Sequence, residues 1–268
     1  MFEEFGIEVV RCRVCGHVFS TYASDPHYDG FWGDEAADGS ESTYWERARA
    51  RMYQDFLTRF VSGRAGRLLD MGCGLGFFVK AVSQHPGWEA HGCEISDTAV
   101  RYARETLGLS TVVRTRLEDA PFPHESFDLV TMWDVLEHLR QPDSVLERCR
   151  ELLTKEGICF IRTPNIDLHL PRARVKKAVL GMQRGVPYLQ ARDHCHHYSP
   201  AGIRTLLERN GFSRVEFVHL RPVDSTLSSS RDVSRRLVRS VWFHAVRGLS
   251  AVTAGRVNLD NLFVVARK

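Results

Sequence analysis

The sequence lacks several features that would decide the class of protein at once. It has no run of about 18 apolar residues, so no membrane-spanning helix is expected. Its first residues, MFEEFGIEVVRC, are acidic and contain no apolar core, which is not the pattern of a secretory signal. The formal net charge is only +3, which is too weak to indicate a nucleic-acid partner by itself. These absences favour a cytoplasmic globular protein that does not bind nucleic acid.

Cysteine does not form the pattern of a disulfide framework. Seven cysteines, an odd number, are spread along 268 residues and mostly stand alone in apolar stretches, which favours a reducing compartment. Cys12 and Cys15 are the exception, since C-x-x-C followed by glycine is half of a zinc knuckle. A structural zinc needs four ligands, so this pair is either a remnant or is completed by His17, His27 or Cys195. Cys12 and Cys15 are therefore candidate zinc ligands.

Short apolar strands alternate with helical stretches from Arg67 onward. We expect strands at RLLDMG, WEAHGCE, STVVR, FDLVTMW and ICFIRTPN, and helices at FFVKAVSQH, DTAVRYARETLG and DSVLERCRELLTKEG, the last ending at Gly157. A helix at YWERARARMYQDFLTRFV precedes them, and a helix at SPAGIRTLLERNGF with strands at SRVEFVHL and NLFVVARK follows. This α/β alternation within about 100 residues predicts a parallel sheet that is covered on both faces.

Three segments do not follow the alternation. Residues 1–40 are expected to be a loop-like N-terminal extension that carries the half knuckle, and 41–268 to be the main domain with late insertions. The insertion at 165–198 is expected to contain a short helix. The insertion at 222–257 contains an apolar stripe over 231–252 with arginines beside it. Such a basic amphipathic helix either makes peripheral contact with an anionic membrane or covers the core.

A glycine cluster joins the first strand of the alternation to the first helix, in the stretch LLDMGCGLGFF. Glycines after a buried strand let the backbone approach a ligand and expose amides at a helix start. The spacing G-x-G-x-G is not the dinucleotide fingerprint G-x-G-x-x-G, and the Gly-Lys-Ser/Thr of a phosphate-binding loop is absent. In a doubly wound sheet this first loop is the favoured place for a ligand.

The stretch LLDMGCGLG resembles motif I of the class I S-adenosylmethionine-dependent methyltransferases, written (D/E)xGxGxG. The stretches DVLEHLRQPDSVLERCRELLTKEGICFIRTPN and DHCHHYSPAGIRTLLERNGF resemble later blocks of the subfamily that includes ubiquinone-biosynthesis O-methyltransferases and many sugar and natural-product methyltransferases. The resemblance covers about residues 60–220 and the last strand. It implies a Rossmann-like, doubly wound, seven-stranded sheet in the order 3-2-1-4-5-7-6 with strand 7 antiparallel.

The resemblance also implies the cofactor, S-adenosylmethionine, its product S-adenosylhomocysteine, and the residues that bind them. Glu94 ends the second strand, and a carboxylate there accepts from both ribose hydroxyls because it has no proton to donate. The stretch RLEDAPFPHESFDLV resembles the loop and strand where a backbone amide and a nearby acid meet the adenine. The expected cofactor-binding residues are Asp70, Gly72, Cys73, Gly74, Gly76, Glu94, Ile95, Leu117, Glu118, Trp133 and Asp134.

Two groups of residues are candidates for the chemistry. Asp134, Glu137 and His138 are spaced so that one helical turn places them on one face. Resemblance to the ubiquinone-pathway enzymes implies that such a group holds a divalent metal, and the alternative is that it supports the loop under the cofactor. Asp193 and His194 form the second group, because histidine titrates near neutral pH and is a natural general base. Resemblance to the sugar methyltransferases implies that this acid–histidine pair lies beside the substrate, whereas the alternative is a hydrogen bond within a loop. The expected catalytic residues are His194, Asp193 and His138.

The expected function is methyl transfer to a small-molecule acceptor, most often an oxygen of a sugar, a lipid-linked intermediate or another metabolite. Basic residues in 165–193 and 231–247 suggest an acceptor with negative charge, although solvent-exposed arginines explain them equally well. Methyl transfer to nitrogen or carbon, and a non-catalytic S-adenosylmethionine-binding protein of the same fold, are the alternatives. The Asn/Asp-Pro-Pro-Tyr/Phe signature of DNA amino-group methylation is absent. The sequence does not indicate the oligomeric state.

Overall fold

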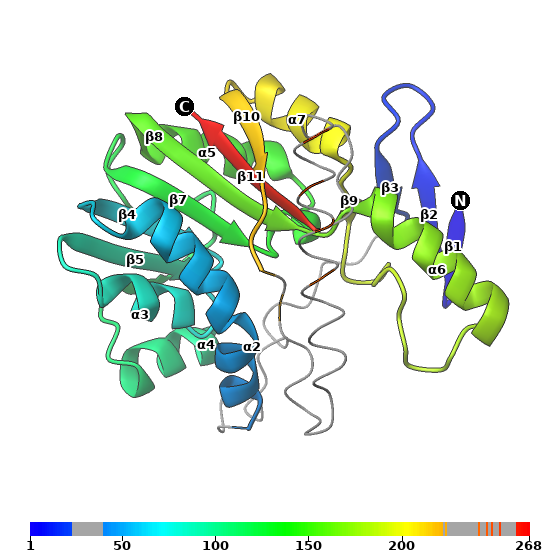
Figure 1. The fold of residues 1–268 in the computed structure, drawn as a ribbon, viewed down its shortest axis with the longest axis horizontal. Helices are drawn as coiled ribbons and strands as arrows, with labels where there is room; N and C mark the ends of the chain where they lie inside the picture. The colour runs from blue at the N-terminus through cyan, green and yellow to red at the C-terminus, as the bar shows by residue number, and fades with distance from the viewer. Residues whose placement is uncertain are drawn as a thin grey trace.

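The computed structural model describes residues 1–22, 40–221 and 261–268, with Val223 and four single helical positions at 241, 245, 248 and 252. Two sheets make up the described part: a seven-stranded sheet with helices packed on its faces, and a four-stranded sheet beside it (Figure 1). The smaller sheet is built mainly from the N-terminal segment.

The seven strands of the large sheet lie in the order β10-β11-β8-β7-β4-β5-β6. The four pairings among β4 to β8 are parallel, whereas β11 is antiparallel to both β8 and β10. Counted along the chain within this sheet, the order is 3-2-1-4-5-7-6 with strand 7 antiparallel, so the expected topology is confirmed. The strands are β4 (Gly66–Met71), β5 (Trp88–Glu94), β6 (Val112–Arg114), β7 (Phe127–Trp133), β8 (Leu153–Thr163), β10 (Ser213–Val218) and β11 (Leu262–Arg267).

The two faces of the large sheet carry separate hydrophobic clusters. One cluster includes Phe56, Phe78 and Val100 from the helices on one face, and the other includes Leu146 and Leu207 from the opposite face. Side chains that are buried on both faces explain why the strands of the sequence are almost continuously apolar. Three helices cover the first face: α2 (Ser40–Phe56) with its π-helical extension Leu57–Val61, α3 (Phe77–Ser83), and α4 (Asp97–Arg101) with its π-helical extension Tyr102–Thr106. The second face is covered by α5 (Pro142–Leu152) and α7 (Pro200–Arg209).

Helix α5 ends five residues earlier than the sequence predicts. The prediction places its end at Gly157, but the chain becomes extended at Leu153 and continues as β8. Leu153 is fully buried and pairs with Phe127 of β7. Burial and strand pairing at this position therefore outweigh the helical propensity of the LLTKE stretch.

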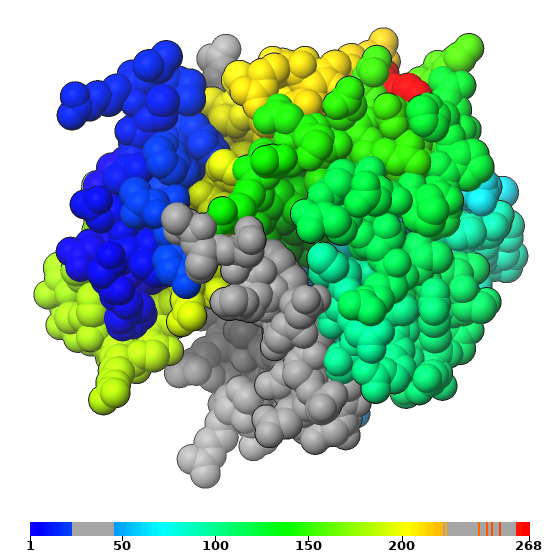
Figure 2. Space-filling model, turned by 180° about the vertical axis from the view of Figure 1, so that it is seen from behind, coloured from blue at the N-terminus to red at the C-terminus, as the bar shows by residue number. Residues whose placement is uncertain are grey.

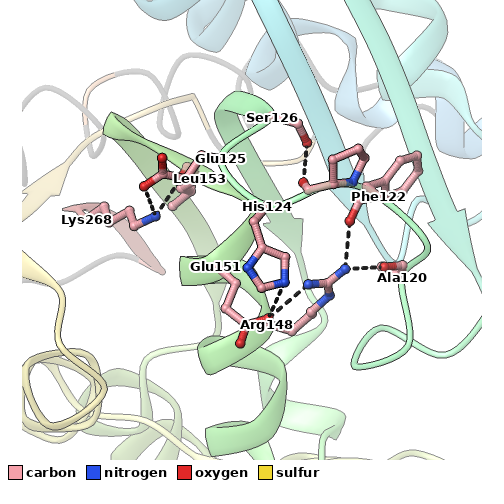
Figure 3. Close-up of polar contacts among 10 residues, drawn as sticks. Ala120, Phe122, His124, Glu125, Ser126, Arg148, Glu151, Leu153 and Lys268 are labelled. Carbon is pink, nitrogen blue, oxygen red and sulfur yellow. Dashed lines mark hydrogen bonds and ion pairs between the residues drawn. The ribbon is translucent and has the colours of Figure 1, made fainter.

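Arg148 of α5 fastens the loop that precedes β7 (Figure 3). Its guanidinium donates to the carbonyl oxygens of Ala120 and Phe122 at 2.7 and 2.8 Å and pairs with Glu151 at 2.9 Å. The same loop carries Leu117, at the carboxyl end of the sheet. An element on one face of the sheet thereby holds a loop that the sequence assigns to the cofactor.

The N-terminal extension is not the loop that we expected. β1 (Phe2–Glu4), β2 (Ile7–Arg11) and β3 (Val18–Ser20) form an antiparallel sheet, and β9 (His196–His197) pairs with β3. The strands are only three to five residues long, and one of their buried side chains is the carboxylate of Glu4. A charged residue at a core position hides the two-residue period on which strand prediction rests.

The insertion at 165–198 contains a 15-residue helix, α6 (Ile166–Leu180), rather than a short one. The Asn165 side chain caps it by accepting from the backbone N–H of Asp167 at 3.1 Å. Ile166, Leu170 and Ala173 of α6 pack against the small sheet in a third hydrophobic cluster. Figure 2 shows this region and the N-terminal segment side by side from the opposite face.

The insertion at 222–257 lies almost wholly outside the described residues, so the choice between membrane and core for the 231–252 stripe stays a prediction. Within the described part of the chain, no helix has the length and apolar character needed to cross a membrane.

Candidate cofactor and active site

The glycine loop leaves the carboxyl end of β4 and enters α3. Gly72, Gly74 and Gly76 all have left-handed backbone angles, with φ of 74°, 53° and 85°. A Cβ on Gly72 would lie 2.7 Å from Cγ2 of Val135, which is closer than any real side chain comes. Both the conformation and the packing therefore demand glycine at position 72. The neighbouring Cys73 is buried, and its N–H donates to the Cys93 carbonyl at 3.1 Å.

Asp70 is buried at the end of β4, with 2% of its surface exposed. Thr131 of β7 donates its hydroxyl to Asp70 Oδ1 at 2.7 Å. Burial raises the pKa of Asp70 to about 7, while the Thr131 hydroxyl and the charge of Arg49 oppose the shift. A cation that approached this carboxyl would stabilise its ionised form.

Glu94 ties the end of β5 to the glycine loop. Its Oε2 accepts from the Gly74 N–H at 2.9 Å, and its Oε1 accepts from the N–H groups of Ile95 and Ser96 at 2.8 and 2.9 Å. Burial raises the pKa of Glu94, and these three N–H groups oppose the rise. A carboxylate has about four lone-pair positions, so Glu94 can accept a further hydrogen bond from a ligand.

The remaining predicted cofactor residues lie around this edge. The loop that carries Leu117 and Glu118 starts beside Glu94, because the Thr115 N–H donates to the Glu94 carbonyl at 3.0 Å. Leu117 is buried, and Glu118 pairs with Arg116 at 2.8 Å. The Trp133 ring packs among the aromatic rings of α2, α3 and β8. Within the described part of the chain, its indole N–H has no hydrogen-bond partner.

Asp134 does not join Glu137 and His138 as the spacing suggested. Its backbone is left-handed, with φ of 57°, and residues 136–138 form only a short 3-10 turn. Its carboxylate forms ion pairs with Arg49 of α2, at 2.9 Å, and with Arg162 of β8. Neither arginine was found by sequence reasoning, because nothing distinguishes them from the other arginines until the chain is folded.

The structure groups Glu137 and His138 with His194 instead. One possible ligand atom from each lies within 4.8 Å of the others, and the two imidazole rings are nearly perpendicular with centroids 4.7 Å apart. Within the described part, neither carboxylate oxygen of Glu137 accepts a regular hydrogen bond. Burial raises the pKa of Glu137 to about 7, although the nearby Thr163 hydroxyl opposes the shift. One carboxylate and two imidazoles are donors that suit a divalent metal.

Burial makes both imidazoles weak bases. It lowers the pKa of His194 well below its usual value, with the charges of His138 and His197 adding to the effect. It also lowers the pKa of His138, which a hydrogen bond to the Asp193 backbone partly offsets. Both rings are therefore neutral at pH 7 and can accept a proton. Asp193 itself is exposed, and its contact with His138 is made by the carbonyl oxygen, at 3.0 Å from Nδ1.

The half knuckle at Cys12 and Cys15 forms a tight turn at the tip of the β2–β3 hairpin. The Gly16 N–H donates to the Cys12 carbonyl at 3.0 Å. Hydrogen bonds from Cys15 and Val14 lower the pKa of the Cys12 thiol. Within the described residues, no third ligand joins these two thiols; His17 bonds His196 at 2.9 Å instead, and His27 lies outside the described residues. Zinc at the knuckle stays a prediction.

A seven-stranded sheet in this order, with a glycine loop after its first strand and a carboxylate ending the second, has the fold of the class I S-adenosylmethionine-dependent methyltransferases. The profile of the methyltransferase-domain family matches residues 44–216. Because this match spans more than half of the chain, the protein belongs to that family.

Similar proteins agree with this assignment. The ubiquinone biosynthesis O-methyltransferase of Haemophilus ducreyi is 31% identical over 132 residues, which cover 46% of this chain and 52% of that protein. The protein of the same name from Neisseria meningitidis is 27% identical over 117 residues, covering 41% and 49%. The chain thus spans about half the length of these curated relatives. Among solved structures, phosphoethanolamine N-methyltransferase 2 of Haemonchus contortus, in complex with S-adenosylhomocysteine, superposes with a TM-score of 0.59. The two chains are 16% identical, and the superposition covers 94% of this chain and 63% of that chain. At this identity the similarity shows a shared fold alone.

Proposed function

We propose that this protein transfers the methyl group of S-adenosylmethionine to an oxygen of a small-molecule acceptor. The observation that carries the proposal is the position of the Glu137–His138–His194 group. Val135, two residues before Glu137, packs directly against Gly72 of the glycine loop. Groups able to take a proton therefore lie next to the loop that we assign to the cofactor. The curated relatives named as O-methyltransferases support oxygen as the methylated atom.

The cofactor residues follow from the same edge of the sheet. Glu94 is our candidate for the ribose hydroxyls, and the loop at Leu117 and Glu118 for the adenine. We assign the methionine carboxylate to Arg49, whose charge lies close enough to Asp70 to lower the pKa of that carboxyl. An arginine beside an aspartate matches a ligand that carries both a carboxylate and an ammonium group.

Transfer to a hydroxyl needs the acceptor oxygen in line with the methyl group and a group that takes the hydroxyl proton. The acceptor oxygen forms a bond to the methyl carbon, the carbon–sulfur bond breaks with its electron pair going to sulfur, and the hydroxyl proton passes to an imidazole. His194 is our candidate for that base, because its imidazole belongs to the group beside the glycine loop and is neutral, although burial weakens it as a base. A divalent cation on Glu137, His138 and His194 is the second candidate, and when bound it would supply an electrophile that orients acceptor oxygens.

The basic residues of the 165–193 insertion give little support to an anionic acceptor. Lys177 donates to the Glu3 carbonyl at 2.7 Å, and Arg174 donates to the Met1 carbonyl at 3.3 Å. Lys176 lies over the Tyr188 ring, and Arg192 over the Tyr22 ring. These contacts join the insertion to the N-terminal segment or to itself, so solvent-exposed or structural arginines remain the simpler account.

Calorimetry with S-adenosylhomocysteine tests the cofactor assignment, and an acceptor panel tests the reaction. We expect the wild-type protein and His194→Ala to bind the ligand, and Gly74→Val not to bind it. The acceptor panel contains a catechol, a phenol, a sugar alcohol and an amine, and we expect His194→Ala to lose the methyl transfer that the wild-type protein shows. A wild-type protein that ignores millimolar ligand would refute the proposal. Chelator distinguishes the two candidates: activity that is lost with chelator and restored by a divalent transition metal such as zinc favours the cation, because two of the three ligands are imidazoles, and unchanged activity favours the base.

A further inference from the structure

One buried carboxylate of the N-terminal sheet holds the loop that leads to His194. Glu4 of β1 has only 1% of its surface exposed. It accepts from three backbone N–H groups of a segment more than 180 positions away: that of Tyr188, that of Leu189 at 2.9 Å and that of Ala191 at 2.7 Å. One side chain of the small sheet thus accepts three hydrogen bonds from this loop.

The loop beyond Glu4 is bent in a way that needs support. Gln190 has a left-handed backbone with φ of 55°, which is unfavourable for a residue other than glycine. Its carbonyl accepts from the N–H groups of Asp193 and His194 at 2.9 and 2.8 Å. Glu4 thus accepts from three N–H groups before and within this turn, and the Gln190 carbonyl accepts from the two that follow Arg192.

The turn places the backbone carbonyl of Asp193 beside the His138 ring of the candidate active site. The Asp193 oxygen lies 3.0 Å from His138 Nδ1. Because a carbonyl oxygen can only accept a hydrogen bond, Nδ1 must carry the proton, and the unprotonated nitrogen of the neutral ring is Nε2. The position of the loop therefore decides which nitrogen of His138 can accept a proton or bind a metal.

We propose that Glu4 is a positioning residue that acts through this loop. It determines which tautomer His138 adopts and where the His194 side chain lies. Ser20 of β3 secures the same loop from a second strand, since its hydroxyl donates to the Ala191 carbonyl at 2.5 Å and its N–H to the Cys195 carbonyl at 3.0 Å. The N-terminal sheet is in this way part of the catalytic apparatus. The effect on methyl transfer rests on the proposed function, whereas the effect on the tautomer does not.

The test compares Glu4→Gln with Glu3→Gln, which makes the same change on an exposed neighbour of the same strand. The amide keeps the size of the side chain but has one acceptor oxygen where the carboxylate has two. Nitrogen-15 NMR of the histidine rings is the main readout, because it reports tautomers without needing an acceptor. We expect one His138 tautomer, protonated at Nδ1, in the wild-type protein and in Glu3→Gln, and a mixture in Glu4→Gln.

Two further measurements complete the test. S-adenosylhomocysteine should bind all three proteins within about twofold, whereas turnover of Glu4→Gln should fall on the order of tenfold or more at unchanged KM for S-adenosylmethionine, the scale of a misplaced base. Ser20→Ala should shift the His138 signals in the same direction but less, which keeps the proposal testable if Glu4→Gln fails to fold. A His138 spectrum that is identical in Glu4→Gln and Glu3→Gln would overturn the proposal. A wild-type protein that binds no S-adenosylhomocysteine would refute the proposed function but leave the tautomer result standing.

Discussion

At the scale of single residues, burial controls the protonation of Asp70, Glu137 and the two imidazoles, whereas Asp134 forms ion pairs with Arg49 and Arg162. Asp70 and Glu137 have a pKa of about 7 because their carboxyls are buried, and the buried imidazoles have lowered pKa values for the same reason. A buried carboxyl is costly to ionise unless a cation lies beside it, so a bound cation would lower the pKa of Asp70 or Glu137. This is the physical background of the two residue-scale predictions.

The first prediction concerns the stability of Glu137→Gln as a function of pH. In the native state Glu137 keeps its proton up to about pH 7, whereas the unfolded chain releases it near the ordinary glutamate pKa of 4.5. Native stability must therefore fall as pH rises between these values, and glutamine removes that loss. In urea unfolding with chelator, we expect Glu137→Gln to gain up to about 3 kcal/mol relative to wild type between pH 5 and pH 8. A stability difference that does not change with pH would contradict the raised pKa.

The second prediction concerns the ribose contact of Glu94. Replacing it with glutamine should weaken S-adenosylhomocysteine binding by about 1–3 kcal/mol, the scale of charge-assisted hydrogen bonds. Glu89→Gln is the matched control, because Glu89 lies on the same strand but is exposed and pairs with Arg67. Titration calorimetry measures both variants. Equal affinity in the two would place the ribose away from Glu94.

At the scale of elements, the carboxyl edge of the sheet brings together groups from separate strands. β4 ends in the glycine loop, β5 ends in Glu94, and β7 leads through Val135 to Glu137 and His138. Parallel strands end at the same edge, so three loops that are distant in the sequence meet there. The packing of Val135 on Gly72 joins the first of these loops to the third.

The third prediction tests that packing with two glycines of similar backbone angle. Gly72 and Gly63 have φ of 74° and 72°, but a Cβ on Gly63 would meet nothing within 4 Å. Gly63→Ala should cost about 1–2 kcal/mol of stability from the backbone alone. Gly72→Ala should cost about 1–3 kcal/mol more because of the overlap with Val135, and it should also weaken S-adenosylhomocysteine binding. Denaturant unfolding that gives equal losses would show that Val135 moves aside freely.

At the scale of the whole molecule, the small sheet and the large sheet have separate cores. The cluster under the small sheet shares no residue with the two clusters of the large sheet. All of the proposed cofactor residues belong to the large sheet, its loops and helix α2, whereas the loop before His194 is held by the small sheet. By the two proposals, cofactor binding depends on the large sheet, whereas placing the base depends on both sheets.

The fourth prediction follows from this division. A chain that lacks residues 1–22 should keep both clusters of the large sheet and bind S-adenosylhomocysteine within about threefold of wild type, less than about 1 kcal/mol. Its methyl transfer should fall by about a hundredfold, because a general base contributes at least that much. Calorimetry and the acceptor panel give the two values. Loss of cofactor binding together with activity would show that the two sheets fold as one unit.

The sequence by itself determined the parts of this protein that depend on neighbours along the chain. The order of strands and helices in the large sheet, the glycine loop after the first of those strands and the place of Glu94 at the end of the second were predicted correctly, because periodicity and turn chemistry act over a few residues and the motifs have fixed spacings. Tertiary structure alone decided the rest. Glu4 is buried because loop amides more than 180 positions away need an acceptor, Asp134 turns toward Arg49 and Arg162 rather than toward Glu137, and Leu153 leaves its helix to pair with Phe127. Each of these outcomes is a competition between local preference and a distant partner, and the partner becomes available only when the chain is folded.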